Sequence, residues 1–168
     1  FVLVTLLSLI AIWGIKESMI FAFMLTLAEI VGLLMVIYAG GEYINPATVD
    51  FKSMIPPVEL SVLNAIILGA FLAFYAFIGF EDMVNIAEEV KDPTRTMPRA
   101  IILTLMIATL FYIAVAVISI LVLSPDILSD SSAPLAKVYE TATGKSASIL
   151  SLIAMVAVLN GALIQIIM

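Results

Sequence analysis

The chain lacks cysteine and histidine, and it is poor in charge, because only 12% of its 168 residues are Asp, Glu, Lys or Arg. Without cysteine it can form no disulfide, zinc–thiolate site or Cys nucleophile, and without histidine it lacks the usual base at neutral pH. Its 7 Lys and Arg against 13 Asp and Glu argue against a nucleic-acid partner, because phosphate binding needs clustered basic residues. A soluble domain normally carries roughly a quarter charged residues, so an ordinary soluble enzyme is excluded.

In place of charge the chain has apolar residues, which make up 64% of it and give a mean hydropathy of +1.25. A helix needs about 20 mostly uncharged residues to cross roughly 30 Å of hydrocarbon. Four stretches meet this requirement, and Glu29 is the only charged residue in them: Ser18–Gly41, Leu60–Phe80, Ala100–Leu123 and Ser146–Met168. The composition and these stretches predict a multi-pass membrane protein.

The fold class that we predict is all-α, a multi-pass transmembrane helical bundle, because the apolar runs do not alternate as the strands of a membrane barrel do. Both ends of the sequence lie inside apolar runs. We therefore expect residues 1–168 to be an internal fragment of one larger membrane domain. The expected spans are 1–13 (partial), 18–40, 60–90 (broken near residue 79), 98–123 and 146–168.

The connections between the expected spans are of two kinds. The short ones, Trp13–Ser18 and Glu88–Arg99, concentrate four of the seven basic residues, and the longer ones hold three scattered lysines. Because cytoplasmic loops are enriched in Lys and Arg, this density favours the short loops as cytoplasmic. On charge alone the opposite orientation stays open.

Proline and its neighbours predict where several helices begin and end. Asp92-Pro93 is expected to stop one helix, and Pro98 suits the first turn of the next. Ser132 resembles an N-cap for a short helix from Pro134 to Ala142 in the outer loop. Gly144 is then expected to end that helix.

Glu29 lies near the middle of its predicted span. A carboxylate at this depth costs about 2.5 to 3.5 kcal/mol on insertion scales, so it should face the bundle or a wet cavity. Residues three or four positions apart around it form a small and polar stripe, which suits close helix packing: Ala22, Thr26, Gly32 and Leu33. One interpretation is a proton- or ion-linked role, and the other is a structural hydrogen bond to a neighbouring helix.

A break in the third predicted span is suggested by Gly79, which follows an apolar and aromatic run and precedes Glu81 and Asp82. In a discontinuous membrane helix the first half leaves carbonyls unpaired, and the second half presents its positive N-terminus. The carbonyls near Tyr75 to Ile78 would then be free to accept bonds from an ammonium group. The ordinary alternative is that the span ends at Phe80 and the two acids are interfacial.

The last span carries weaker candidates, Asn160-Gly161 and Gln165. Polar and small residues in membrane helices commonly serve helix–helix hydrogen bonding and close packing. A functional role for Asn160 stays open beside that interpretation. The sequence shows no metal-ligand cluster and no catalytic Ser/His/Asp set.

The run FYAFIGFEDMVNIAEEVKDPTRTMPRAI, at 74–101, resembles the sixth-helix signature of the amino acid-polyamine-organocation permeases. Gly14-Ile-Lys-Glu-Ser18 similarly resembles the loop between the fourth and fifth helices of that family. The two motifs occur at the family's spacing. By this register the chain covers the end of helix four through helix eight.

The resemblance implies a fold of two inverted five-helix repeats with a broken sixth helix. It further implies that six residues at the break bind substrate: Phe74, Tyr75, Ala76, Phe77, Ile78 and Gly79. The backbone carbonyls of Tyr75, Ala76 and Ile78 would accept from the substrate's amino group, and Gly79 would permit the break. Glu81 matches a pH-sensing acid of some relatives. Glu29 departs from the pattern, because one branch of the family has a lysine there, and we predict that it links protonation to transport.

Together these features predict a secondary active transporter of amino acids or related amines, coupled to protons or to an exchanged substrate. The sodium ion stays open as the coupling ion. We expect no cofactor, no metal and no catalytic residue, and a place in the plasma membrane with lipid and the rest of the permease chain as partners. The alternatives are a non-transporting membrane sensor on the same fold and a membrane enzyme using Glu81 and Asp82.

Overall fold

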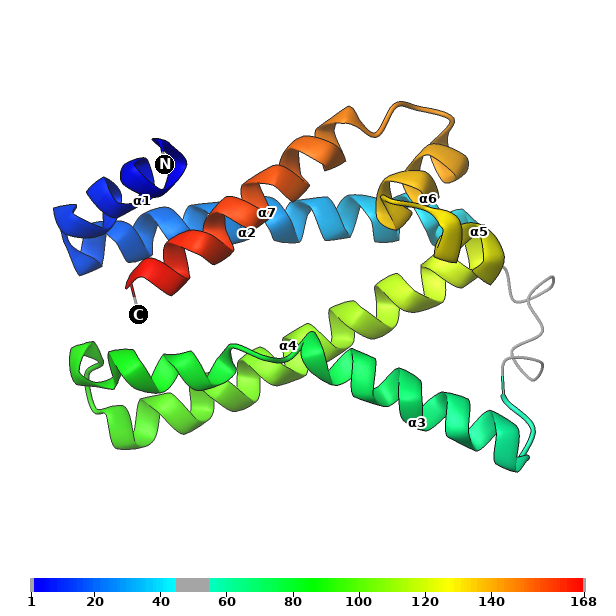
Figure 1. The fold of residues 1–168 in the computed structure, drawn as a ribbon, viewed down its shortest axis with the longest axis horizontal. Coiled ribbons are helices and arrows are strands. Elements are labelled where there is room, and N and C mark those ends of the chain that lie inside the picture. The colour runs from blue at the N-terminus through cyan, green and yellow to red at the C-terminus, as the bar shows by residue number, and fades with distance from the viewer. Residues whose placement is uncertain (1, 45–54, 168) are drawn as a thin grey trace. The chain divides into compact units, whose positions relative to one another are not determined.

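The computed structural model describes residues 2–44 and 55–167, and every regular element within these ranges is helical (Figure 1). This confirms the predicted all-α class. The elements in chain order are α1 (Val2–Trp13), α2 (Ile15–Gly40), the 3-10 helix η1 (Gly41–Tyr43), α3 (Leu60–Tyr75), the 3-10 helix η2 (Phe80–Glu89), α4 (Pro93–Val122), α5 (Pro125–Asp130), α6 (Pro134–Thr143) and α7 (Ser148–Ile167).

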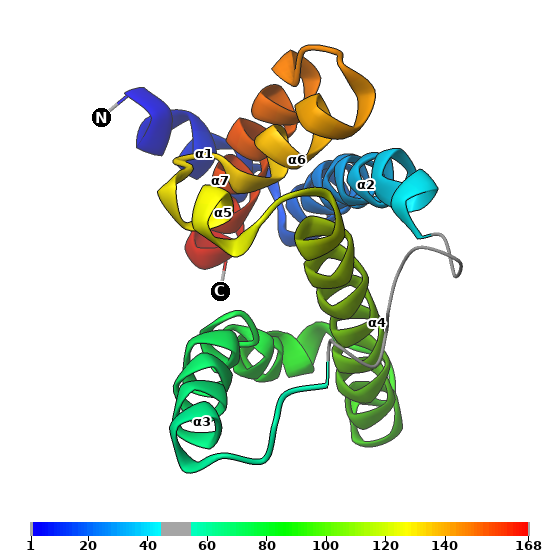
Figure 2. The same ribbon diagram turned by 90° about the vertical axis from the view of Figure 1, so that its right-hand side faces the viewer.

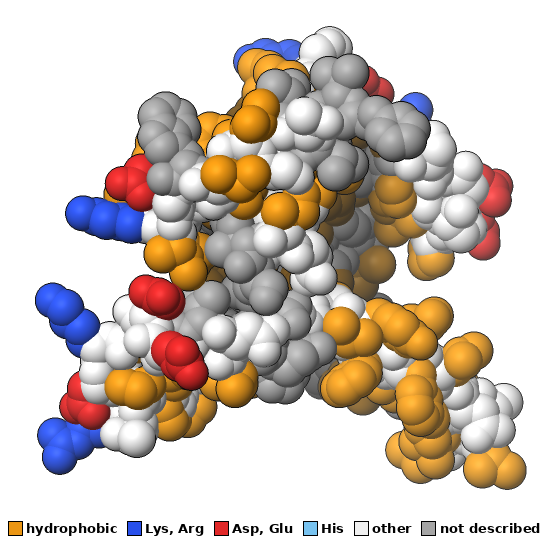
Figure 3. Space-filling view, turned by 60° about the vertical axis from the view of Figure 1, so that its left-hand side comes forward, with side chains coloured by type: hydrophobic (Ala, Val, Ile, Leu, Met, Phe, Trp, Pro, Cys, Tyr) orange, Lys and Arg blue, Asp and Glu red, His pale blue; other side chains and the backbone are white. Residues whose placement is uncertain are grey.

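Within the described residues, three stretches of helix are long and apolar enough to cross a membrane: Ile15–Tyr43, Pro93–Val122 and Ser148–Ile166. The helix α3 is apolar but shorter, with 16 residues. Figure 3 shows hydrophobic side chains exposed on the face that it displays. Apolar side chains that point outward are expected where the surrounding medium is hydrocarbon rather than water.

The chain divides into two compact units, and the first comprises Phe1–Ile44 and Phe111–Met168. In this unit α2 packs along α7 and against α6, and α1 contacts both α2 and α7 (Figures 1 and 2). One buried cluster gathers side chains from α2, the end of α4, α6 and the start of α7: Val36, Ile118, Leu123, Val138, Ala147 and Leu150. A second, smaller cluster joins Leu7, Ala22 and Leu163.

Two glycines let α2 approach its neighbours closely. A Cβ atom built on Gly32 would lie 2.9 Å from Cγ2 of Ile153 on α7. A Cβ atom on Gly40 would overlap Cγ2 of Ile118, on the part of α4 that belongs to this unit. Both glycines are buried, so α2 depends on small residues here, as helices packed within membranes commonly do.

Gly40→Ala is expected to destabilise the full-length protein, because the added methyl group overlaps Ile118. Overpacking of this kind typically costs about 1 to 3 kcal/mol. The matched control is Gly41→Ala, where no described atom lies within 4 Å of the new Cβ. Thermal unfolding of the detergent-solubilised protein should show a lower midpoint for Gly40→Ala only, and equal midpoints for the two variants would contradict the packing.

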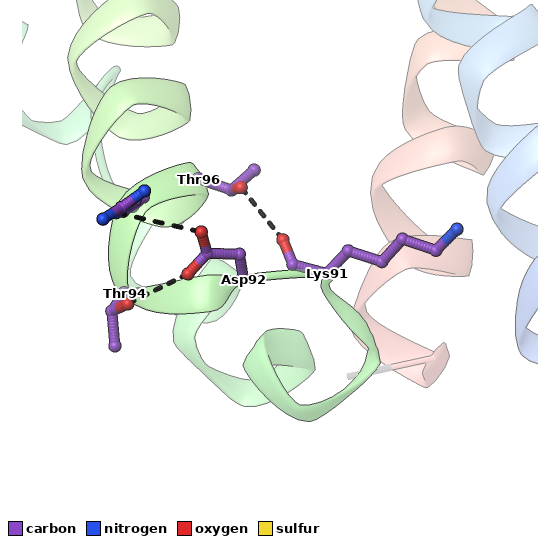
Figure 4. A network of polar contacts seen from close by, with 5 residues as sticks. Lys91, Asp92, Thr94 and Thr96 are labelled. Atoms are coloured by element: carbon purple, nitrogen blue, oxygen red, sulfur yellow. Dashed lines mark hydrogen bonds and ion pairs between the residues drawn. The ribbon is translucent and has the colours of Figure 1, made fainter.

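The second unit, Asn45–Leu110, contains α3, η2 and the beginning of α4. Asp92 starts α4 from a left-handed backbone conformation, with φ 52°, and its carbonyl accepts from the backbone N–H groups of Arg95 and Thr96. Its side chain accepts from the Thr94 hydroxyl at 3.2 Å and lies 3.9 Å from Arg95 Nε, while the Thr96 hydroxyl donates to the Lys91 carbonyl (Figure 4).

These contacts correct one prediction about α4. The helix begins at Pro93, so Pro98 lies inside it and not in its first turn. The Asp92 carbonyl and side chain organise the first turn five residues earlier than expected. Pro93 occupies the position at which proline suits a helix, because its missing N–H would have no partner there.

The predicted helix of the outer loop is present as α6, which ends at Gly144 with φ 67° as expected. The N-cap prediction was wrong, since Ala133 occupies that position without a side-chain cap, and the hydroxyl of Ser131 accepts from the Ala133 N–H at 3.2 Å. Glu140 of α6 accepts from the Ala147 N–H at 3.2 Å, just before α7 begins. The loop thereby ties α6 to the start of the last span.

Candidate functional site

A polar contact joins α2 and α7 in the first unit. Glu29 and Thr26 lie one turn apart on α2, and Asn160 lies on α7. The Asn160 Nδ2 group donates to Glu29 Oε1 at 2.8 Å and to Thr26 Oγ1 at 2.9 Å. Asn160 is only 3% exposed. The predicted small and polar stripe around Glu29 therefore faces α7.

The side-chain hydrogen bonds of Asn160 use its amide nitrogen. Both N–H bonds of its amide are used, but Asn160 Oδ1 is buried and has no hydrogen-bond partner among the residues that the structure describes. Thr26 is fully engaged, because its hydroxyl also donates to the Ala22 carbonyl at 3.1 Å. These hydrogen bonds of Asn160 link the two helices directly.

Asn160→Leu is expected to lower the thermal unfolding midpoint of the full-length protein. The variant leaves the half-buried Glu29 carboxylate without its donor, and an unsatisfied buried polar group costs about 1 to 3 kcal/mol. In the Glu29→Gln background the same substitution should cost less, because the charge-assisted bond is already gone. Equal losses in both backgrounds would show that Asn160 and Glu29 are not coupled.

A cavity of about 540 Å³ opens beside Glu29, between α2, α6 and α7 of the first unit. Among the described residues that line it, Glu29 is the only charged one, and Ser151 adds one hydroxyl. The other lining residues are apolar or glycine: Gly32, Leu33, Val36, Ala133, Pro134, Leu135, Ala136, Leu150, Ile153, Ala154 and Ala157. A carboxylate therefore lies at the wall of a mostly apolar space.

The second unit contains the predicted break in the helix. The α-helix α3 ends at Tyr75, and the N–H groups of Ala76, Phe77 and Ile78 then bond to carbonyls three residues back. Gly79 follows with φ 114°, a conformation that glycine adopts and other residues rarely do. The chain continues as the 3-10 helix η2 from Phe80.

The residues predicted at the break are mostly accessible. Phe74, Tyr75, Ala76 and Ile78 are exposed, whereas Phe77 and Gly79 are half-buried. One expectation needs correction, because the Tyr75 carbonyl accepts from the Ile78 N–H at 3.3 Å and is not wholly free. A carbonyl oxygen has two lone pairs, so it can still accept a second bond.

The remaining candidate residues from the sequence are Glu81, Asp82, Gly161 and Asn160. The side chains of Glu81 and Asp82 lie outside the described part of the structure, so their predicted roles stay predictions. Gly161 was expected to allow close packing, but no described atom lies within 4 Å of a Cβ built on it. Asn160, singled out only weakly in the sequence, is the direct partner of Glu29.

Sequence reasoning did not single out Ser18 as a buried residue. Its side chain is fully buried where α1 turns into α2, and its hydroxyl lies 2.8 Å from the carbonyl oxygens of both Ile10 and Gly14. The signal that could have found it is its place at the end of the Gly14–Ser18 motif. It stabilises the corner between the two helices.

An all-helical apolar chain with an interrupted helix and a carboxylate inside the bundle has the features of a multi-pass membrane transport protein. The family described as amino acid permease matches residues 1–168. The chain belongs to this amino acid permease family.

Individual relatives agree with this assignment. The methylthioribose transporter of Bacillus subtilis is 35% identical over 70% of this chain and 24% of its own length. The chloroplastic cationic amino acid transporter 9 of Arabidopsis thaliana is 31% identical over 97% of this chain and 27% of its own. The branched-chain amino acid permease BcaP of B. subtilis is 31% identical over 70% and 24%. The chain spans about a quarter of the length of these curated relatives, and no solved structure matches it significantly.

Proposed function

We propose that the full-length protein is a secondary active transporter that moves amino acids or related amines by alternating access. The observation that carries this proposal is the break between Tyr75 and Gly79 in a chain of the amino acid permease family. Discontinuous helices place carbonyls and a positive helix end at the membrane interior, where transporters bind substrate.

The chemistry of the break suits an α-amino acid. The carbonyls of Tyr75, Ala76 and Ile78 are acceptors for an ammonium group, and the N-terminal end of η2 at Phe80 offers N–H donors to a carboxylate. The exposed rings of Phe74 and Tyr75 can cover an apolar side chain. Binding and release need no covalent chemistry, so the proposal is a transporter without cofactor or metal and not an enzyme.

We assign the coupling of transport to protons to two carboxylates, with Glu29 as the principal group and Glu81 as the second. Glu29 lies on a membrane helix and borders a cavity, and an ionisable residue in this setting is by default a functional candidate. Protonation removes its charge and weakens its bond to Asn160, so the proton can alter the contact between α2 and α7. A proton is therefore the proposed coupling ion, with sodium and substrate exchange as the alternatives.

The plasma membrane is the proposed location. The apolar helices support a membrane protein. They do not distinguish the plasma membrane from an internal membrane, and one relative is named as chloroplastic. Expression of the tagged full-length protein followed by membrane fractionation tests this assignment. Recovery in an internal membrane alone would overturn it.

Reconstitution of the full-length protein into proteoliposomes tests transport. Radiolabelled amino acids and amines should accumulate inside when a proton gradient is imposed, and accumulation should saturate with concentration. Liposomes without protein are the control. If no amino acid or amine enters above that control, with or without a gradient or an internal exchange substrate, the proposal is wrong.

A further inference from the structure

We draw no further inference here: the strongest candidate, the exposed basic cluster of Lys91, Arg95 and Arg99 around the start of α4, carries none, because nothing in the structure shows what covers it in the full-length protein.

Discussion

Glu29→Gln should reduce proton-driven accumulation of substrate by the full-length protein in proteoliposomes about tenfold or more. The substitution keeps the size of the side chain and can still hydrogen-bond to Asn160, but it removes the titratable group. Exchange of substrate between the two sides should persist, because exchange does not require a net proton movement. The pH dependence of uptake should flatten in the variant.

The control is Thr26→Val, which removes the second hydrogen bond of Asn160 but leaves the carboxylate in place. This variant should lose some stability and keep proton-driven accumulation. If Glu29→Gln accumulates substrate with unchanged pH dependence, Glu29 is structural and its bond to Asn160 is its whole role.

Gly79→Val should remove substrate binding at the break. Gly79 has φ 114°, and a β-branched residue in such a conformation is strained by roughly 1 to 3 kcal/mol. A steric clash is not the expected cause of the loss, because no described atom lies within 4 Å of a Cβ at this position. The backbone should relax and displace the carbonyls at 75–78, so uptake should fall to the level of protein-free liposomes.

Gly144→Val is the matched control for this prediction. Gly144 also has positive φ, at 67°, and also has open space around its Cβ, but it ends α6 in the first unit. Both variants should lose comparable stability in thermal unfolding, and only Gly79→Val should lose uptake. Equal transport by the two variants would argue against a substrate site at the break.

Much of this architecture was predictable because it depends on local signals. Long apolar runs predict spanning helices, and the structure contains them at α2, α4 and α7. The glycine at position 79 predicted a break, and the chain leaves the α-helical conformation four residues before it. Gly144 predicted a helix end because a left-handed residue is the common way to close a helix.

Other features were not predictable, because they depend on contacts between distant residues. The sequence indicated that Glu29 needs a partner inside the bundle, but it could not identify Asn160, which is 131 positions away. The cavity likewise requires the relative placement of three helices. The start of α4 was predicted wrongly for a local reason. Pro98 was expected in the first turn of the helix, but Pro93 occupies that position. The short helix α5 has only 6 residues, too few for apolar periodicity to show.

The proposed substrate site at the break can be tested directly by cysteine accessibility. A single cysteine can be placed at Ala76, an exposed position in the break, in a full-length protein with any other cysteines replaced. A membrane-impermeant thiol reagent should label it, and a saturating concentration of a transported amino acid should slow the labelling severalfold. A labelling rate unchanged by that substrate, while a transport assay shows uptake by the same variant, would contradict the account.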